Sequence, residues 1–129
     1  MFLDLFYIYE NWYQMKGTQL GEFEELVLLI VGVLHPDAYG LSIREEIIKQ
    51  SGRKVAIGAV HSALSRLQEK GFLSSDLAEA THERGGRRKR LFNITAEGKR
   101  ALERNHEMRN SLFNQIPEIA LKGLNLSGI

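Results

Sequence analysis

Apolar residues recur at helical spacing along much of the chain, and turn-forming residues separate the runs. The longest apolar run, Leu26–Leu34, has nine residues and predicts a first helix over Leu20–Val33 that is buried on most sides. Pro36 lies just after this run and is expected to keep the helix from continuing. A second helix is predicted over 42–50, because Ser42 can serve as the N-cap of a capping box.

A third helix is predicted over Ile57–Glu69, and its two sides differ in size and polarity. The expected buried side is bulky and branched, with Ile57, Val60, Leu64 and Leu67. The expected outer side is small, hydroxylic and cationic, with Gly58, Ala59, Ser62, Ser65, Arg66 and Glu69. His61 falls on the flank between them, where a half-buried polar residue and a phosphate contact are equally open interpretations.

Two strands are predicted next, over Phe72–Ala80 and Lys89–Thr95, with Gly85 and Gly86 as the turn between them. Thr95 then caps a fourth helix, which is expected to end before Pro117. The last dozen residues are expected to be frayed.

The predicted order is three helices, a hairpin and a helix, which is that of a winged helix-turn-helix. The fold class is therefore mainly α with a two-stranded β wing. We expect an N-terminal extension over 1–19, a winged helix-turn-helix domain over 20–95, a C-terminal dimerisation helix over 96–116 and a tail over 117–129.

Charge is unevenly distributed along a chain whose formal net charge is only +1. Residues 1–52 carry 3 basic and 8 acidic side chains, whereas residues 53–104 carry 12 basic and 6 acidic ones. A uniformly basic surface is thus excluded, and any binding of nucleic acid has to come from a local patch.

The predicted turn supplies such a patch, with five cations within seven residues: Arg84, Arg87, Arg88, Lys89 and Arg90. Regularly spaced phosphates are the partner that offsets repulsion among such cations. The two glycines let the backbone approach closely, and arginine suits a narrow minor groove. The alternative is a solvated basic loop.

The outer side of the third helix fits the same partner. Small residues near the start of a helix, here Gly58 and Ala59, let its backbone approach base edges in the major groove. Ser62 and Ser65 can donate hydrogen bonds to bases or phosphates, and Arg66 can bond a phosphate or a guanine edge. An ordinary amphipathic helix is the alternative.

Catalytic and metal-binding patterns are absent from the sequence. The chain has no cysteine, its four histidines are scattered, and no serine stands in a G-x-S-x-G elbow. We therefore expect no metal, no cofactor and no enzymatic activity.

The first fourteen residues are apolar and aromatic, but they have neither a basic start nor a cleavage pattern, so a signal peptide is not expected. An extra amphipathic helix and an upstream extension before a natural start at Met15 are both open. The nine-residue apolar run is too short for a membrane span. We expect a cytoplasmic protein that does not contact a membrane.

Four motifs, in order, resemble those of PadR-type transcriptional regulators of the small subtype, whose C-terminal part is a single helix. They are A-Y-G at 38–40, the linker and recognition helix at 52–73, the basic wing at 83–90 and T-A-E-G at 95–98. The resemblance covers about residues 20–102. It departs from the family at His61, where a tyrosine is common, at Leu41-Ser42, and at Leu91-Phe92.

The resemblance implies a homodimeric DNA-binding protein, usually a repressor, and adds Tyr39 of the A-Y-G motif to the expected DNA-binding residues. It also implies that the last helix, often with the first, supplies the dimer contact, and that some members bind a small-molecule effector there. The residues expected in that contact are Leu26, Ile30, Leu102, Met108 and Leu112.

The sequence as a whole predicts a sequence-specific regulator that binds double-stranded DNA as a homodimer. The recognition helix, about 57–69, would enter the major groove, and the wing, 82–90, would contact the flanking backbone or minor groove. The alternative is a winged-helix module that binds another protein through its aromatic N-terminus and does not bind DNA.

Overall fold

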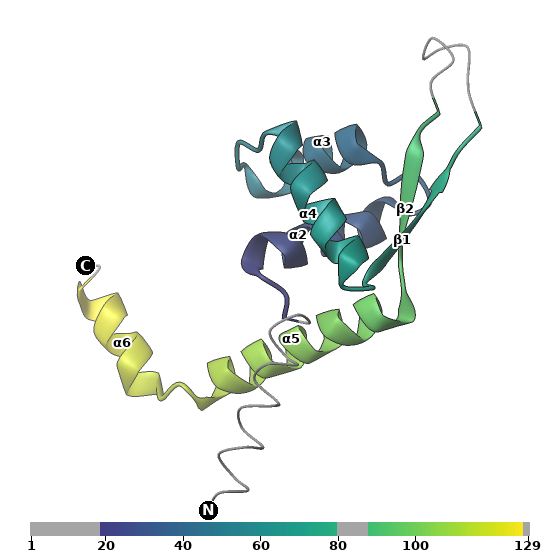
Figure 1. Cartoon of the computed structure of the whole chain (residues 1–129). Coiled ribbons are helices and arrows are strands. Elements are labelled where there is room, and N and C mark those ends of the chain that lie inside the picture. The colour runs from purple at the N-terminus through teal and green to yellow at the C-terminus, as the bar shows by residue number, and fades with distance from the viewer. Residues whose placement is uncertain (1–18, 80–87, 128–129) are drawn as a thin grey trace, which may run out of the picture.

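The computed structural model describes residues 19–79 and 88–127, with side chains as far as residue 122 (Figure 1). The N-terminal stretch, for which an extra helix and an upstream extension were both open, and the predicted Gly85-Gly86 turn lie outside the described residues.

Three helices pack on one another to form the core: α2 (Glu22–Leu34), α3 (Gly40–Ser51) and α4 (Ile57–Glu69). Each contributes a stripe of apolar residues to a single cluster. The largest side chains that are almost entirely buried in it are Leu28, Ile43, Ile47, Leu64 and Leu67. Burial of this kind removes apolar surface from water and is the main stabilising contribution to a small domain.

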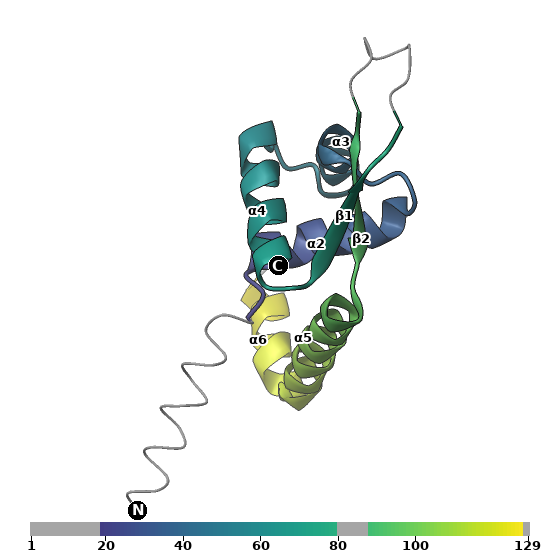
Figure 2. The ribbon, with the colours of Figure 1, turned by 45° about the vertical axis from the view of Figure 1, so that its right-hand side comes forward.

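A two-stranded antiparallel sheet stands beside the helices, formed by β1 (Leu73–Leu77) and β2 (Arg90–Ile94) (Figures 1 and 2). Beyond the paired strands, the Ala78 N–H donates to the Lys89 carbonyl at 2.7 Å. The Phe92 N–H donates to the Ala38 carbonyl at 2.8 Å, which attaches β2 to the segment before α3. The predicted winged helix-turn-helix, mainly α with a two-stranded wing, is confirmed.

Helix α5 (Ala96–Gln115) follows β2 after a single residue, Thr95. The Thr95 hydroxyl accepts a hydrogen bond from the Gly98 N–H at 3.0 Å and donates to the Gly71 carbonyl at 2.6 Å. Gly98 lies against β1, where a Cβ atom would collide with the carbonyl oxygen of Phe72. The predicted cap is confirmed, and the start of α5 is fastened to the end of the sheet where β1 begins and β2 ends.

The start of α3 differs from the sequence prediction. The helix begins at Gly40 and not at Ser42, and Tyr39 is its N-cap residue. The Ser42 hydroxyl accepts a hydrogen bond from the Tyr39 N–H at 2.9 Å, so Ser42 satisfies an orphan donor from inside the first turn. Gly52 ends the helix with a φ of 71°, the left-handed conformation that favours glycine.

The C-terminal residues also differ from the prediction. Where a frayed end was expected, the structure has a helix, α6 (Glu118–Ser127), directly after Pro117. The Ala120 N–H donates to the Pro117 carbonyl at 3.0 Å. Helices α5 and α6 lie at the end of the molecule away from the wing tip (Figure 1).

Candidate nucleic-acid interface

The outer side of α4 is open to solvent along its length. Gly58, Ala59, His61, Ser62, Ser65 and Arg66 are all exposed, and Val60, Ala63, Leu64 and Leu67 are buried. The two predicted sides are confirmed except at Ile57, which is 40% exposed because it is the first residue of the helix, outside the core contact. The start of α4 is placed by Arg44, whose Nε donates to the Val55 carbonyl at 2.7 Å.

His61 packs directly against the start of α3. A Cβ atom on Gly40 would come within 2.7 Å of His61 Cε1, so a side chain larger than hydrogen would displace the imidazole. The imidazole lines an open cleft of about 490 Å³ between α3, α4 and β2. The lining residues are Tyr39, Gly40, Leu41, His61, Arg88, Lys89, Arg90 and Phe92.

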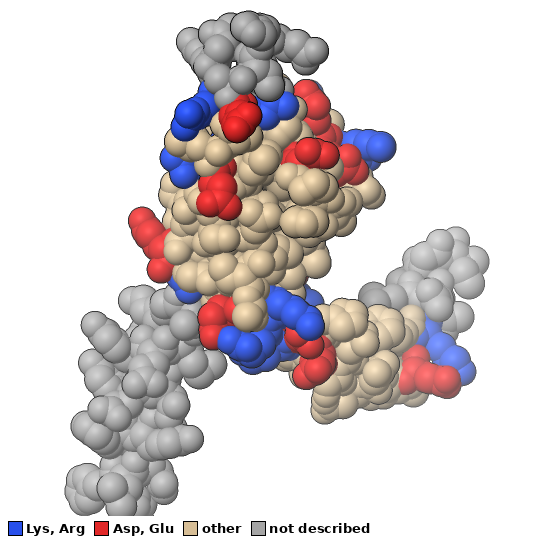
Figure 3. Space-filling model, turned by 90° about the vertical axis from the view of Figure 1, so that its right-hand side faces the viewer, with Lys and Arg blue, Asp and Glu red and all other residues tan. Residues whose placement is uncertain are grey.

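Three basic residues at the base of the wing face different surroundings. Arg88 is exposed, Lys89 Nζ lies 4.4 Å from the centroid of the Tyr39 ring, and Arg90 donates to the Ser75 hydroxyl at 3.0 Å. Figure 3 shows Lys and Arg side chains near the upper end of the described surface, with acidic side chains beside them. The remaining predicted wing residues, Arg84, Gly85, Gly86 and Arg87, lie outside the described residues.

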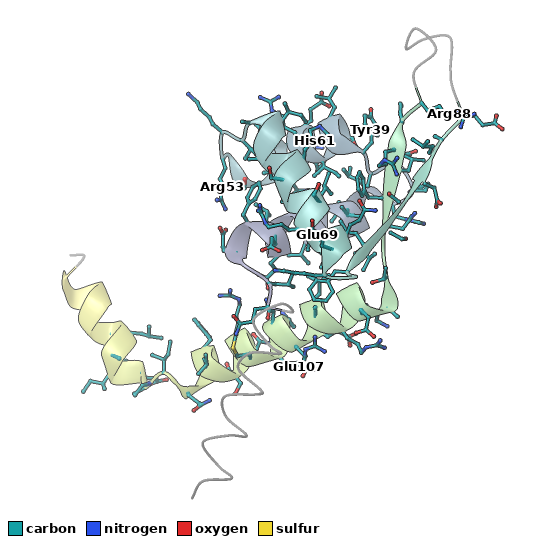
Figure 4. The ribbon with its side chains drawn as sticks, viewed as in Figure 1. Tyr39, Arg53, His61, Glu69, Arg88 and Glu107 are labelled. Atoms are coloured by element: carbon teal, nitrogen blue, oxygen red, sulfur yellow. The ribbon has the colours of Figure 1, made fainter. Side chains whose placement is uncertain are left out.

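His61, Tyr39 and Arg88 lie towards the same end of the molecule, the one from which the wing extends (Figure 4). The structure thus brings the start of α3, the outer side of α4 and the base of the wing together around one cleft. The arrangement offers hydrogen-bond donors and cations to an elongated, negatively charged partner.

Arg66 is partly engaged inside the protein. Its Nε lies 3.9 Å from one carboxylate oxygen of Glu24, and the other oxygen of Glu24 is 2.7 Å from Lys70 Nζ. Glu24 is only 9% exposed, although half of the Arg66 side chain is open to solvent. The guanidinium is therefore drawn towards α2 and not towards the start of α4.

Two cations that the sequence analysis left out of its site flank the start of α4. Arg53 pairs with Glu22 at 2.5 Å, and its guanidinium lies 5.7 Å from the centroid of the Phe23 ring. Lys54 is exposed, two residues before the helix cap. The signal was present as a pair of basic residues in the linker before the recognition helix.

The other end of the molecule exposes apolar side chains. Met108 and Leu112 are at least half exposed on α5, and Leu102 is partly buried. On α2, Leu26 is partly buried, and Ile30 is 4% exposed because it packs into the protein's own core. Ile30 therefore does not present a surface to a partner. The exposed apolar residues of α2 are Leu29 and Val33, which the sequence analysis did not select.

Other classes of site receive no support from the described residues. Within residues 19–79 and 88–127, no group of three His, Asp or Glu side chains is arranged to hold a metal ion. None of the helices in the described part of the chain has the length and apolar content that crossing a membrane would require.

Comparisons with known proteins agree with this geometry. Residues 27–104 match the model of the transcriptional regulator PadR-like family. No curated protein sequence matches the chain at a significant level.

Solved structures resemble the protein over most of its length. A PadR-like transcription factor from Bacteroides fragilis is 23% identical with a TM-score of 0.63, covering 85% of this chain and 98% of its own. A PadR family regulator from hypervirulent Clostridium difficile is 30% identical with a TM-score of 0.53, covering 70% of this chain and 95% of its own. On these grounds the chain belongs to the PadR-like family of transcriptional regulators.

Proposed function

We propose that the protein is a homodimeric, sequence-specific DNA-binding repressor. The observation that carries this proposal is the outer side of α4, which presents small and hydroxylic residues to solvent beside a basic wing. In this proposal, α4 enters the major groove and residues 82–90 contact the flanking backbone or minor groove.

The class of the protein follows from its family. Because the PadR-like family consists of transcriptional regulators, the chain is a regulator and not an enzyme. Binding of double-stranded DNA, the site residues, repression and the dimer belong to the proposal, as does a cytoplasmic location.

Base reading is assigned to the first two turns of α4. Gly58 and Ala59 leave room for the helix backbone to approach base edges, and Ser62 follows on the same exposed side. Ser65 lies one turn further along, within reach of the groove wall or the backbone.

Phosphate contacts are assigned to the residues around the cleft. His61, Arg88 and Arg90 line it, and Lys54 lies at the start of α4. Arg84 and Arg87, with Gly85 and Gly86, belong to the same proposal from the sequence alone. Lys89 and Tyr39 also line the cleft.

The contact between the two copies of the homodimer is assigned to α5 and α2, at the end of the molecule away from the cleft. One recognition helix reads only a few base pairs, so useful specificity requires two half-sites. The apolar residues Leu102, Met108 and Leu112 of α5 would pack against a second copy, together with the α2 surface around Leu26. Leu29 and Val33 extend that surface.

Chain organisation and regulation complete the proposal. Residues 20–95 form the DNA-binding domain, 96–116 the dimerisation helix and 117–129 a C-terminal segment that contains α6. A small-molecule effector would bind at the dimer interface. What supports this part of the proposal is a hollow of about 500 Å³ lined by Ile94, Leu102 and their neighbours, because Leu102 is one of the residues assigned to the dimer contact.

The test is DNA selection followed by a salt titration. Sequences bound from a random duplex pool define an operator, and affinity for it is measured by fluorescence anisotropy at several salt concentrations. With about four phosphate contacts per subunit, log K should fall with log salt with a slope of roughly −7. A promoter carrying that operator should lose transcription when the protein is present.

Two results would contradict the proposal. Absence of duplex binding at low salt would favour the alternative of a protein-binding module, whose motivating aromatic segment lies outside the described residues. Equal affinity for every duplex would remove the sequence-specific role.

A further inference from the structure

Lys89 differs from the basic residues on either side of it. Arg88, Lys89 and Arg90 all line the cleft, but their side chains have different partners. Arg88 is exposed and Arg90 is bonded to Ser75 across the hairpin, whereas Lys89 is only partly exposed. Its ammonium lies 4.4 Å from the centroid of the Tyr39 ring, within the range of a cation–π contact.

The Tyr39 ring is attached to a firmly held backbone. The Tyr39 N–H donates to Ser42 Oγ and its carbonyl accepts from the Ile43 N–H, both at 2.9 Å, because Tyr39 caps α3. The preceding residue, Ala38, is fully buried, and its carbonyl accepts from the Phe92 N–H of β2. The ring is thus a fixed surface beside the wing.

Position 89 is also the last point at which the hairpin is paired among the described residues. The Lys89 carbonyl accepts the Ala78 N–H at 2.7 Å, and residues 80–87 follow beyond this pair. The base of β2 is therefore attached to the start of α3 at two places, by the main chain at Phe92 and by the side chain at Lys89. The body of the sheet is also held by Gln68 of α4, whose side chain donates to Ser75 Oγ at 2.9 Å, so the Lys89 contact acts on the last described residues of the wing.

We propose that the contact between Lys89 and Tyr39 sets the direction in which the wing leaves the domain, and that both are positioning residues for DNA binding and not phosphate ligands. The inference rests on the proposed DNA-binding function. Lys89 and Tyr39 line the cleft without binding phosphate themselves, because the charge of Lys89 acts on an aromatic ring of the same chain.

The test is a double-mutant cycle on the full-length protein, with affinity for the selected operator measured at several salt concentrations. Tyr39→Leu and Lys89→Gln should each weaken binding about two- to fivefold, the size of one exposed cation–π contact. The double variant should be no weaker than either single variant, because both remove the same contact. Tyr39→Phe and Lys89→Arg keep a ring and a cation, so each should restore most of the affinity.

The salt slope separates positioning from phosphate binding. Lys89→Gln should leave the slope unchanged, whereas the matched neighbour Arg88→Gln should make it shallower by about 0.9 per subunit contact. A slope that falls equally for both variants would overturn the inference, as would losses that add in the double variant. A loss of affinity in Tyr39→Phe equal to that in Tyr39→Leu would assign the effect to the hydroxyl and also overturn it.

A measurement without DNA keeps the contact separate from the proposed function. The aromatic ring should shift the Lys89 ε-methylene proton resonances upfield, and the shift should disappear in Tyr39→Leu. Absence of the shift in the unchanged protein overturns the contact itself. If the shift is present but the unchanged protein binds no duplex, the proposed function fails and the positioning role fails with it.

Discussion

The winged-helix body, residues 19–79 and 88–95, and the C-terminal arm, residues 106–127, treat their apolar side chains in opposite ways. The body places most of its large apolar residues inside a cluster shared by three helices and the sheet. In the arm, every described side chain from His106 to Lys122 is exposed, including Leu112 and Phe113.

The difference lies in the available neighbours and not in the residue types. Helices α2, α3 and α4 each pack against the other two, whereas the second half of α5 extends past the body (Figures 1 and 2). Its first half is fastened to the body. Among the described residues, the side-chain contacts from α5 to α2 end at Glu25, which accepts a hydrogen bond from Asn105 at 2.8 Å and pairs with Arg109 at 3.8 Å. Apolar side chains that remain uncovered on a helix stabilise it little in water, so the proposed second copy would supply the arm with a surface that the body does not need.

The largest expected effect tests whether the body is stable by itself. Leu64→Ala should lower the free energy of unfolding by about 2–5 kcal/mol, because it opens a cavity in the cluster. Urea denaturation measures the change, and it should be independent of protein concentration. Leu112→Ala is the matched control, since it removes the same atoms from the arm, and its effect should vanish on dilution. If Leu112→Ala lowered the free energy of unfolding as much as Leu64→Ala at every protein concentration, the contrast between body and arm would be contradicted.

The next prediction tests whether the first turn of α5 packs against the body. Gly98→Ala should destabilise the protein by about 1–3 kcal/mol, because the new methyl group would meet the carbonyl oxygen of Phe72. Gly58→Ala in α4 is the control, since no atom lies within 4 Å of its added methyl group. That variant should be neutral or slightly stabilising, as alanine favours helix over glycine. The midpoint temperatures of thermal unfolding of the two variants measure the difference.

The arm itself is tested by placing a charge on its apolar side. Leu112→Arg should weaken self-association at least about tenfold, or roughly 1.4 kcal/mol, by leaving an arginine in an apolar contact. Sedimentation equilibrium measures the change. Glu107→Arg, at an exposed position about 140° around the helix from Leu112, serves as the control. A monomer at micromolar concentration before any substitution would contradict the assigned dimer.

The smallest effects are expected at the DNA-facing surface of the body and should leave self-association unchanged. Ser62→Ala should alter preference among operators by about 1 kcal/mol while changing general affinity little, because a base contact carries sequence information. Arg66→Ala should weaken all duplexes equally, because its half-exposed guanidinium lies near Glu24, away from the start of α4, and would reach a phosphate and not a base edge. Fluorescence anisotropy measures the affinity of both variants for the operator and for its single-base changes at two salt concentrations. Equal losses on every sequence for both would remove α4 from base reading.

The sequence predicted the body well because its signals are local. The bounds of α4, Ile57–Glu69, agree with the structure, since apolar period and flanking residues define them. The Thr95 cap and the hairpin were readable for the same reason. The start of α3 was missed because Ser42 resembles an N-cap residue but serves from the third helical position.

The rest depends on contacts between distant parts of the chain. Helix α2 is apolar nearly all round, so its pattern could not tell buried Ile30 from exposed Leu29 and Val33. Pairing of Lys89 with Tyr39 joins residues fifty positions apart and leaves no periodic signal. Helix α6 was overlooked because ten residues without a cap residue resemble a loose end.

The single residue between β2 and α5 has a consequence for operator architecture. Thr95 is bonded to Gly71 and Gly98, so the chain has no flexible joint between the wing and the helix assigned to the dimer. In the proposed homodimer, two recognition helices joined in this way would keep one separation and one relative rotation. Adding one base pair between half-sites rotates one of them by roughly 35° about the duplex axis. The protein is therefore expected to tolerate base changes within a half-site better than a change in the number of base pairs between half-sites.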